Sequence, residues 1–241
     1  MLRKKLIAAN WKMNNAPTGF DAKDSSYRTK SDVDVVIFPT FLDIEKCTKA
    51  ELIVGAQYGR PEEKGAFTGD ESMKQIKTSG CTYVLCGHSE RRIHHSESDA
   101  FVAEQVIAAI DCGLIPILCI GETADEREMG QAKEVVKRQL ETVLLATSHQ
   151  LQARNLVIAY EPVWAIGTGK TATPTDAEEM HAYIRSLLSE ELQNDMRIIY
   201  GGSMKPENAK DLLSQKNIDG GLVGAASLDP VAFGKIVNSA L

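Results

Sequence analysis

Glu161 stands directly after the apolar residues 156–160 and is followed by Pro162. A carboxylate at the end of a buried strand is costly unless it is paired or used, so this position alone leaves a structural ion pair and a catalytic base equally open. The residues that follow favour the base. Residues 165–169 form a small, glycine-containing tip between two stiffer segments, as expected of a lid that closes over a site and excludes water. We therefore predict that Glu161 accepts a proton from a small substrate.

Asn10, Lys12 and His88 are further polar side chains that follow apolar segments. A spacing of two places Asn10 and Lys12 on one side of a strand end, with Trp11 on the other. A lysine at a strand end is most often a solvated tip, but the pairing with Asn10 favours a functional role. His88 precedes a polar run that can open a helix. Because the positive end of a helix disfavours a protonated imidazole, we predict that His88 is a neutral hydrogen-bond donor.

Two glycine-rich turns predict an anion site. They follow the last two apolar runs, as YGGS at 200–203 and LVGAAS at 222–227. Such turns hold phosphate in many barrels, through backbone N–H groups and a helix N-terminus. The formal net charge is −6, so an anionic substrate needs positive potential concentrated locally, and Lys12 can supply it. The predicted substrate is therefore small and phosphorylated.

Neither a metal site nor a disulfide framework is expected. His94 and His95 are adjacent, so on a helix their side chains point apart, and no matching set of Cys, Asp or Glu accompanies them. The five cysteines are odd in number and contain no C-x-x-C pair. Cys81, Cys86 and Cys119 fall at the starts or interiors of predicted strands, where a reduced thiol is an ordinary small apolar residue. We predict structural thiols.

Charge and hydropathy also limit the partners and the location of the protein. The acidic net charge argues against nucleic acid, because phosphate backbones need a basic face. Membrane insertion is not expected, since the longest apolar runs have the length of strands rather than the ~20 residues of a spanning helix. The apolar residues 6–9 are too few for the core of a signal peptide. These features predict a cytoplasmic protein.

Strand-length apolar runs recur along the chain, with helix-length segments between them. They lie at residues 6–10, 33–38, 52–55, 83–86, 115–120, 156–160, 198–200 and 220–223. These runs are continuous rather than alternating, which is typical of a parallel sheet buried on both faces. Eight such strands alternating with helices predict an α/β protein, a (β/α)8 barrel, as a single domain over residues 1–241. The alternative, an open doubly wound sheet, lacks the G-x-G-x-x-G expected after its first strand.

Three segments have clear helical character. Residues 124–147 are the clearest, with one apolar stripe among Glu, Lys and Gln. Residues 99–110 and 175–192 show a similar pattern. Thr175 and Glu178 predict a capping box at the start of the last of these helices.

Pro206 and Pro230 each predict the first turn of a helix near the end of the chain. Residues 14–32 are different, because they contain few large apolar residues besides Phe20 and Tyr27. We expect a short or irregular segment there in place of a full amphipathic helix.

These segments together closely resemble the triosephosphate isomerase family, from residue 6 to the C-terminus. The matching motifs arrive in the family's order on the expected strands, which makes the set highly specific. They are ANWKMN at 9–14, GAFTG at 65–69, GHSERR at 87–92, GET at 121–123, the lid segment at 160–171, YGGS at 200–203 and VGAASL at 223–228. The resemblance implies a TIM barrel that interconverts dihydroxyacetone phosphate and D-glyceraldehyde 3-phosphate through an enediolate, in glycolysis and gluconeogenesis.

The resemblance also implies roles for the catalytic residues. Glu161 matches the family's base and His88 its electrophile. Asn10 and Lys12 match the residues that hold the substrate and its charge, and Glu90 matches a supporting carboxylate.

Further implied roles concern the lid, the phosphate and the partner subunit. Ser89 matches a residue that touches the base while the lid is open. The phosphate grip corresponds to backbone groups of Gly167, Ser203, Gly224 and Ala225. No cofactor is implied. A homodimer is implied, because residues 65–69 resemble the loop that reaches into the partner subunit.

Three residues depart from the family's usual pattern. Tyr58 stands where Asn is usual in the third loop, and Asn15 stands where Gly commonly follows the first motif. Both bear on the dimer contact. Ala225 replaces the usual second Gly of the phosphate turn. Its N–H survives, but the residue would be strained if the turn needs a positive φ.

Two other functions compete with this interpretation. One is another phosphosugar barrel of similar design, which the lid after Glu161 and the presence of His88 together disfavour. The other is a barrel kept only as a binding protein, which the complete set of site residues disfavours.

Overall fold

A computed structural model describes residues 3–147, 151–166 and 171–241. Within these residues, eight parallel strands form one sheet in the order β2-β1-β8-β7-β6-β5-β4-β3. The strands are β1 (Lys5–Asn10), β2 (Val33–Phe38), β3 (Gly55–Ala56), β4 (Tyr83–Cys86), β5 (Ile115–Ile120), β6 (Val157–Tyr160), β7 (Arg197–Tyr200) and β8 (Gly220–Val223). The two ends of the sheet meet, because Ile37 of β2 forms a parallel bridge with Val54. The predicted barrel is confirmed.

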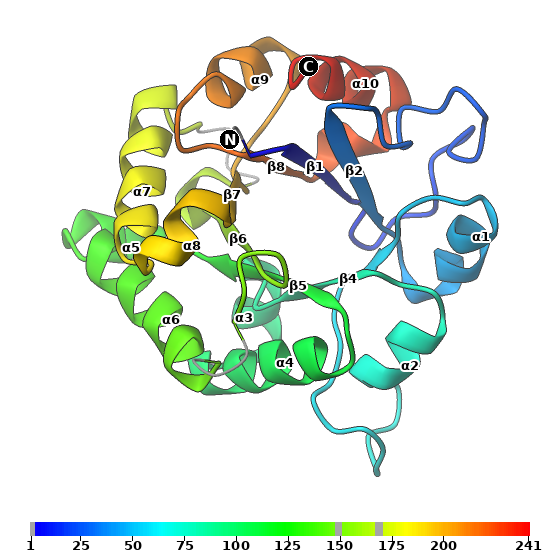
Figure 1. Ribbon diagram of the computed structural model, residues 1–241, viewed down its shortest axis with the longest axis horizontal. Helices are drawn as coiled ribbons and strands as arrows, with labels where there is room; N and C mark the ends of the chain where they lie inside the picture. Colours follow the sequence, from blue (N-terminus) through cyan, green and yellow to red (C-terminus); the bar gives the residue numbers. More distant parts are fainter. Residues whose placement is uncertain (1–2, 148–150, 167–170) are drawn as a thin grey trace.

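Helices surround the strands on the outside of the barrel (Figure 1). Those in the described residues are α1 (Ile44–Lys49), α2 (Met73–Thr78), α3 (Ser89–His95), α4 (Asp99–Asp111), α5 (Ala124–Glu128), α6 (Ala132–Ala146), α7 (Pro174–Ser186), α8 (Glu190–Asp195), α9 (Pro206–Leu213) and α10 (Pro230–Asn238). None of them has both the length and the apolar character needed to span a membrane.

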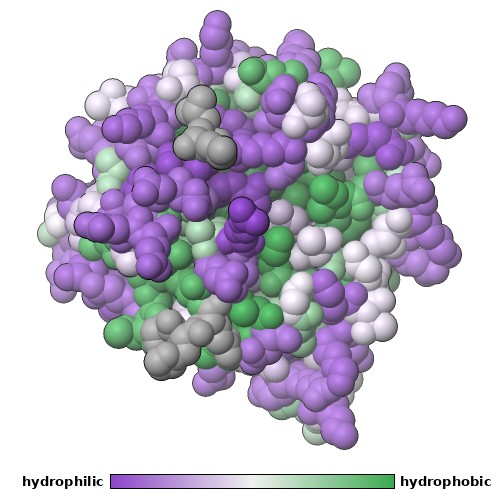
Figure 2. Space-filling model, viewed as in Figure 1, coloured by the Kyte–Doolittle hydropathy of each residue, from purple (hydrophilic) through white to green (hydrophobic). Residues whose placement is uncertain are grey.

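Alternate residues of each strand fill two separate apolar layers. Leu6 and Ala8 of β1 belong to the cluster inside the barrel, whereas Ile7 and Ala9 pack in the layer between strands and helices. In Figure 2 hydrophilic side chains dominate the rim of the molecule, and hydrophobic surface shows as interrupted patches toward the middle of this face. The five cysteines are free thiols, as predicted.

The third strand is shorter than predicted. Residues 52–55 were expected to form it, but β3 contains only Gly55 and Ala56, and Val54 contributes a single bridge. The reason lies at the end of α1, where the N–H of Leu52 donates to the carbonyl of Cys47 at 3.3 Å. Leu52 therefore finishes the preceding turn and is lost from the sheet.

The segment predicted to be helical over residues 124–147 contains two helices. They are α5 and α6, separated by Gly130, which has a φ of +73°. The N–H of Gln131 donates to the carbonyl of Glu126 at 2.8 Å and ends the first helix. A left-handed glycine with such a bond is a common helix terminator, and the apolar stripe alone did not reveal it.

The helix predicted over residues 175–192 is also two helices, α7 and α8. Its capping box was misplaced by two residues. Thr173 and Asp176 form it, with mutual hydrogen bonds of 3.1 and 3.2 Å. Pro174 explains the shift, because a proline suits the first helical position and places the cap directly before it.

Other helix predictions are confirmed. Residues 99–110 lie within α4, and Pro206 and Pro230 are the first residues of α9 and α10. No helix forms in residues 11–32, all of which the structure describes, so the irregular segment expected after the first strand is confirmed as well.

Candidate active site

Asn10 and Lys12 lie where β1 ends. The Trp11 side chain between them is fully buried in the outer apolar layer. Lys12 has a φ of +51°, an uncommon conformation for a residue with a side chain. Two side chains hold it there: Asn10 Oδ1 accepts the N–H of Lys12 at 3.0 Å, and Gln57 Nε2 donates to its carbonyl at 2.8 Å. The backbone that carries the lysine is thus fixed from both sides.

The Lys12 ammonium pairs with Glu90. Nζ lies 2.5 Å from Glu90 Oε1, and both side chains are partly exposed. Burial by itself would raise the pKa of Glu90, but the hydrogen bond and the charge of Lys12 outweigh it and hold that pKa below its ordinary value. Glu90 therefore stays ionised at neutral pH and keeps the ammonium beside Asn10 and His88.

His88 joins β4 to α3. Gly87, with a φ of +71°, turns the backbone after the strand, and His88 is the N-cap residue of the helix. The N–H of Glu90 donates to Nδ1 of His88 at 3.3 Å. Because Nδ1 accepts a hydrogen bond, Nε2 is the nitrogen that carries the proton of a neutral ring. Nε2 lies 3.3 Å from Asn10 Nδ2, inside the barrel mouth.

Glu161 follows β6 directly and is 2% exposed. Its Oε2 accepts the backbone N–H of Ser89 at 2.8 Å. Its Oε1 lies 3.0 Å from His88 Nε2. Oε1 has no hydrogen-bond partner among the residues that the structure describes. One buried oxygen of this carboxylate is therefore available to a ligand.

Glu122, a residue without a predicted role, anchors the start of the predicted lid. This fully buried carboxylate follows β5. It accepts hydrogen bonds from Trp164 Nε1 at 2.8 Å and Tyr160 Oη at 3.1 Å. Arg127 adds an ion pair at 3.2 Å and lies 4.4 Å from the Trp164 ring centroid. Its position two residues after the end of a strand was the signal that could have drawn attention to Glu122.

The glycine-rich turns lie beside these groups. Ser203 Oγ donates to the carbonyl of Ala165 at 2.8 Å, which ties the turn after β7 to the lid segment. Gly224 and Ala225 follow β8, and Ala225 begins a short 3-10 helix, Ala225–Leu228. Gly167, the other predicted phosphate contact, lies outside the described residues together with 168–170.

One cavity of about 570 Å³ brings most of the predicted residues together. This volume is within the usual range for small-molecule sites. Its lining includes Asn10, Lys12, His88, Glu161, Ser203, Gly224 and Ala225. Glu90 lies outside this lining but reaches it through its bond to Lys12.

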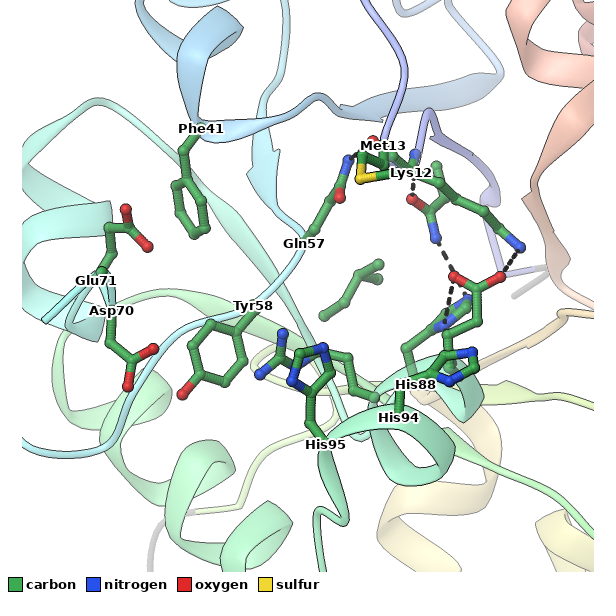
Figure 3. Close-up of a pocket in the computed structure, with 15 residues that line it drawn as sticks. Lys12, Met13, Phe41, Gln57, Tyr58, Asp70, Glu71, His88, His94 and His95 are labelled. Carbon is green, nitrogen blue, oxygen red and sulfur yellow. Dashed lines mark hydrogen bonds and ion pairs between the residues drawn. The ribbon is translucent and has the colours of Figure 1, made fainter. Parts of the chain in front are cut away.

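A second cavity of about 470 Å³ adjoins the first and shares Asn10, Lys12 and His88 with it. In Figure 3, Lys12 and His88 lie on one side of this cavity, and Tyr58 and Asp70 lie on the other. His94 and His95 also line it. Within the described ranges, no group of three or more His, Cys, Asp or Glu side chains is placed to hold a metal ion.

Comparison with known proteins identifies the family. A family model described as triosephosphate isomerase matches residues 5–240. The chain belongs to the triosephosphate isomerase family. A triosephosphate isomerase of Moorella thermoacetica is 47% identical, and the match covers 98% of this chain and 99% of the relative. One of Fusobacterium nucleatum is 46% identical over 99% of each chain, and one of Carboxydothermus hydrogenoformans is 44% identical over the full length of both.

The residues that depart from the triosephosphate isomerase pattern are accommodated without visible strain. Tyr58 is buried, and the Arg91 guanidinium lies 3.6 Å from its ring centroid. Asn15 is exposed. Ala225 does not have a positive φ, so the strain considered for an alanine in the phosphate turn is absent.

Proposed function

We propose that this protein interconverts dihydroxyacetone phosphate and D-glyceraldehyde 3-phosphate by moving a proton between adjacent carbons. Membership of the triosephosphate isomerase family supports the reaction. The assignment of roles rests on one observation, the convergence of three groups at one cavity. His88 Nε2 lies 3.0 Å from Glu161 Oε1 and 3.3 Å from Asn10 Nδ2. Triosephosphate isomerases are the standard example of a carboxylate base that works with a neutral histidine under a closing loop.

Glu161 acts as the base. Its carboxylate removes a proton from the carbon next to the substrate carbonyl. The electrons of the broken C–H bond form the C=C bond of an enediolate, and the carbonyl oxygen takes up the negative charge. The protonated Glu161 then returns its proton to the neighbouring carbon, while the hydroxyl proton on that carbon's oxygen moves to the charged oxygen, so the isomerisation balances. To reach the substrate, the carboxylate gives up the Ser89 N–H that it accepts at 2.8 Å.

His88 and Asn10 stabilise the charge that develops on oxygen. The Asn10 amide nitrogen faces the cavity because Asn10 Oδ1 is occupied by the Lys12 N–H. Two N–H donors 3.3 Å apart can both reach one oxyanion, and fixed donors aimed at developing charge give the largest electrostatic benefit. His88 Nε2–H is also placed to pass a proton between the two substrate oxygens.

Lys12 and the glycine-rich turns hold the phosphate end. Lys12 supplies the local positive charge that an acidic protein needs for an anionic substrate. Backbone N–H groups of Ser203, Gly224 and Ala225 grip the phosphate, and Gly167 does the same by resemblance. The phosphate does not react, so its binding energy serves positioning and closure. Glu90 holds the lysine in place through their ion pair.

The test is isomerisation of glyceraldehyde 3-phosphate by the purified protein and by Glu161→Gln. We expect the variant to lose about 100- to 10,000-fold in kcat, the usual contribution of a positioned proton-transfer group. Glu178→Gln is the control, because Glu178 accepts the Asn217 N–H before β8, at the other end of the barrel. An inactive wild type would refute the function. Near-normal kcat in Glu161→Gln would refute the base.

We also propose that the chain is a single catalytic domain that acts in the cytoplasm as a homodimer. The dimer is supported by the open cavity beside Lys12 and by Met13 at its edge, which is 93% exposed. By resemblance, residues 65–69 of a second copy enter this cavity. Light scattering at micromolar concentration should give twice the 26.3 kDa mass of one chain. A monomeric mass would contradict the dimer.

A further inference from the structure

The barrel departs from strand–helix alternation after β1. In this fold each strand is normally followed by a helix that covers the outer face of the barrel. Residues 11–32 form only turns and bends and pass beside α10 (Figure 1). Aromatic rings take the place of the helix. The Trp11 and Tyr27 rings pack edge to face with their centroids 5.3 Å apart, and the Tyr27 ring stacks on that of Phe233 in α10 with a centroid distance of 5.0 Å. The irregular segment is therefore packed as core, although it lacks regular structure.

Tyr27 makes a specific polar contact from within this cluster. Its side chain is fully buried, and its hydroxyl donates to the carbonyl of Ser227 at 2.7 Å, across 200 residues of sequence. Burial raises the pKa of Tyr27 above its ordinary value, and the charge of Asp229 adds to the effect. The hydroxyl therefore stays protonated and remains a donor.

Ser227 connects this contact to the phosphate turn. Its N–H donates to the carbonyl of Gly224 at 2.8 Å, and its hydroxyl donates to the same oxygen at 2.7 Å. Ser227 is itself fully buried. A series of buried hydrogen bonds thus runs from Tyr27 through Ser227 to Gly224, which lines the cavity together with Ala225.

The Ser227 carbonyl needs the Tyr27 hydroxyl as its hydrogen-bond donor, because no N–H group of the residues that follow it donates to it. Three residues on, Pro230 has no N–H. Four residues on, the N–H of Val231 donates to Asp229 Oδ1 at 2.8 Å. Among the described residues, the Tyr27 hydroxyl is the only donor to this carbonyl. Loss of the hydroxyl would leave a buried acceptor unpaired, which the turn can relieve only by moving.

We propose that Tyr27 is a positioning residue of the phosphate site, which sets the Gly224–Ala225 turn through Ser227 in place of the missing first helix. The inference rests on the proposed function, because it takes this turn to be the phosphate grip. Tyr27 touches no substrate. Its effect is to hold the turn N–H groups in the geometry that an anion needs before the anion arrives.

Tyr27→Phe tests the proposal, because it removes one oxygen atom and keeps the ring. Tyr83→Phe is the matched control: Tyr83 is also buried, and its hydroxyl accepts Arg197 Nη2 at 3.1 Å at the start of β4, far from the site. We expect Tyr27→Phe to weaken binding of inorganic phosphate, measured by calorimetry, by about 3- to 30-fold. KM for glyceraldehyde 3-phosphate should rise by a similar factor while kcat stays within about twofold. Tyr83→Phe should change neither constant.

A second variant covers the case in which Tyr27→Phe does not fold. Phe233→Leu keeps the hydroxyl but removes the ring on which Tyr27 stacks, and it should weaken phosphate binding in the same direction by a smaller factor. If Tyr27→Phe lowers only the melting temperature, or if both tyrosine variants lose phosphate equally, Tyr27 is merely structural and the proposal is wrong. Calorimetry needs no turnover. A wild type that binds phosphate without isomerising would refute the proposed function. The phosphate affinities of Tyr27→Phe and Tyr83→Phe would still show whether Tyr27 positions the turn.

Discussion

Gly201 determines how much room the Glu161 side chain has. It follows β7 directly, and its N–H donates to the carbonyl of Tyr160 at 2.7 Å. A Cβ at this position would lie 2.7 Å from Glu161 Cγ. Non-bonded carbons settle at about 3.5–4.0 Å, so Gly201→Ala forces the Glu161 side chain to move by roughly 1 Å.

This displacement gives the size of the expected effect. If Glu161 is the base, moving it by about 1 Å can slow the reaction by up to about 100-fold. We expect kcat/KM of Gly201→Ala to fall by about 10- to 100-fold, almost entirely through kcat. Phosphate affinity should not change, because the atoms nearest to the added methyl group belong to Glu161 and Tyr160. The free energy of unfolding should fall by about 1–3 kcal/mol, as for other overpacked sites.

The assay is steady-state isomerisation together with a thermal melt, and Gly59→Ala is the control. A Cβ on Gly59 would lie 2.6 Å from Ile76 Cδ1 and Met73 Sδ, an equal overlap with α2 side chains away from the cavity. This variant should lose stability and keep its kcat. If Gly201→Ala is destabilised to the same degree and retains full kcat, the position of Glu161 does not limit the reaction, and the reasoning is refuted.

Three further outcomes follow from single residues. Burial lowers the pKa of His181 to about 3, whereas the same imidazole in the unfolded chain has a pKa of about 6.5. Because the unfolded state then binds the extra proton, the free energy of unfolding should fall as the pH drops from about 6.5 toward 3. Denaturant titrations should show a flatter pH dependence for His181→Phe. Gly121→Ala should not fold, because its methyl group would lie 1.7 Å from the Glu161 carbonyl oxygen; soluble expression and circular dichroism would reveal a folded variant if this is wrong. Cys112 is half-buried and the other four cysteines are buried, so a thiol reagent followed by peptide mass spectrometry should label Cys112 first, and Cys112→Ser should lose the fast phase.

Much of the candidate site was predictable because the topology of the barrel brings the ends of its strands together. Asn10, His88 and Glu161 each follow an apolar run, and the carboxyl ends of parallel strands meet at one end of a barrel. Identifying the strands therefore places these side chains near one another even though up to 151 residues separate them. The structure adds the contacts, such as the bond from the Ser89 N–H to Glu161, which residue order alone does not specify.

Contacts that depend on long-range packing were not predictable. In the sequence, Tyr27 stands out only as a large side chain in a segment with few apolar residues. Nothing near it in the sequence indicates that its hydroxyl contacts Ser227. Helix ends were misjudged for a related reason. The apolar stripe of residues 124–147 continues across Gly130, and only the conformation of that glycine divides the helix. The period of apolar residues indicates which face of a helix is buried, whereas the ends of a helix depend on the conformation of single residues.

The contacts of Glu161 and of the lid segment indicate what drives closure in the proposed mechanism. As it stands, the carboxylate is bound to the Ser89 N–H at 2.8 Å, and Trp164 is bound to Glu122 at 2.8 Å. The first bond favours this position of Glu161 over one in which the carboxylate reaches a substrate carbon, and the second holds the start of the lid segment where it is. In the proposed mechanism a substrate must supply enough binding energy to replace these bonds, and its phosphate is the group proposed to do so, because it would contact the turns without reacting. The same reasoning explains why accurate positioning of the phosphate turn matters for a reaction that takes place several atoms away.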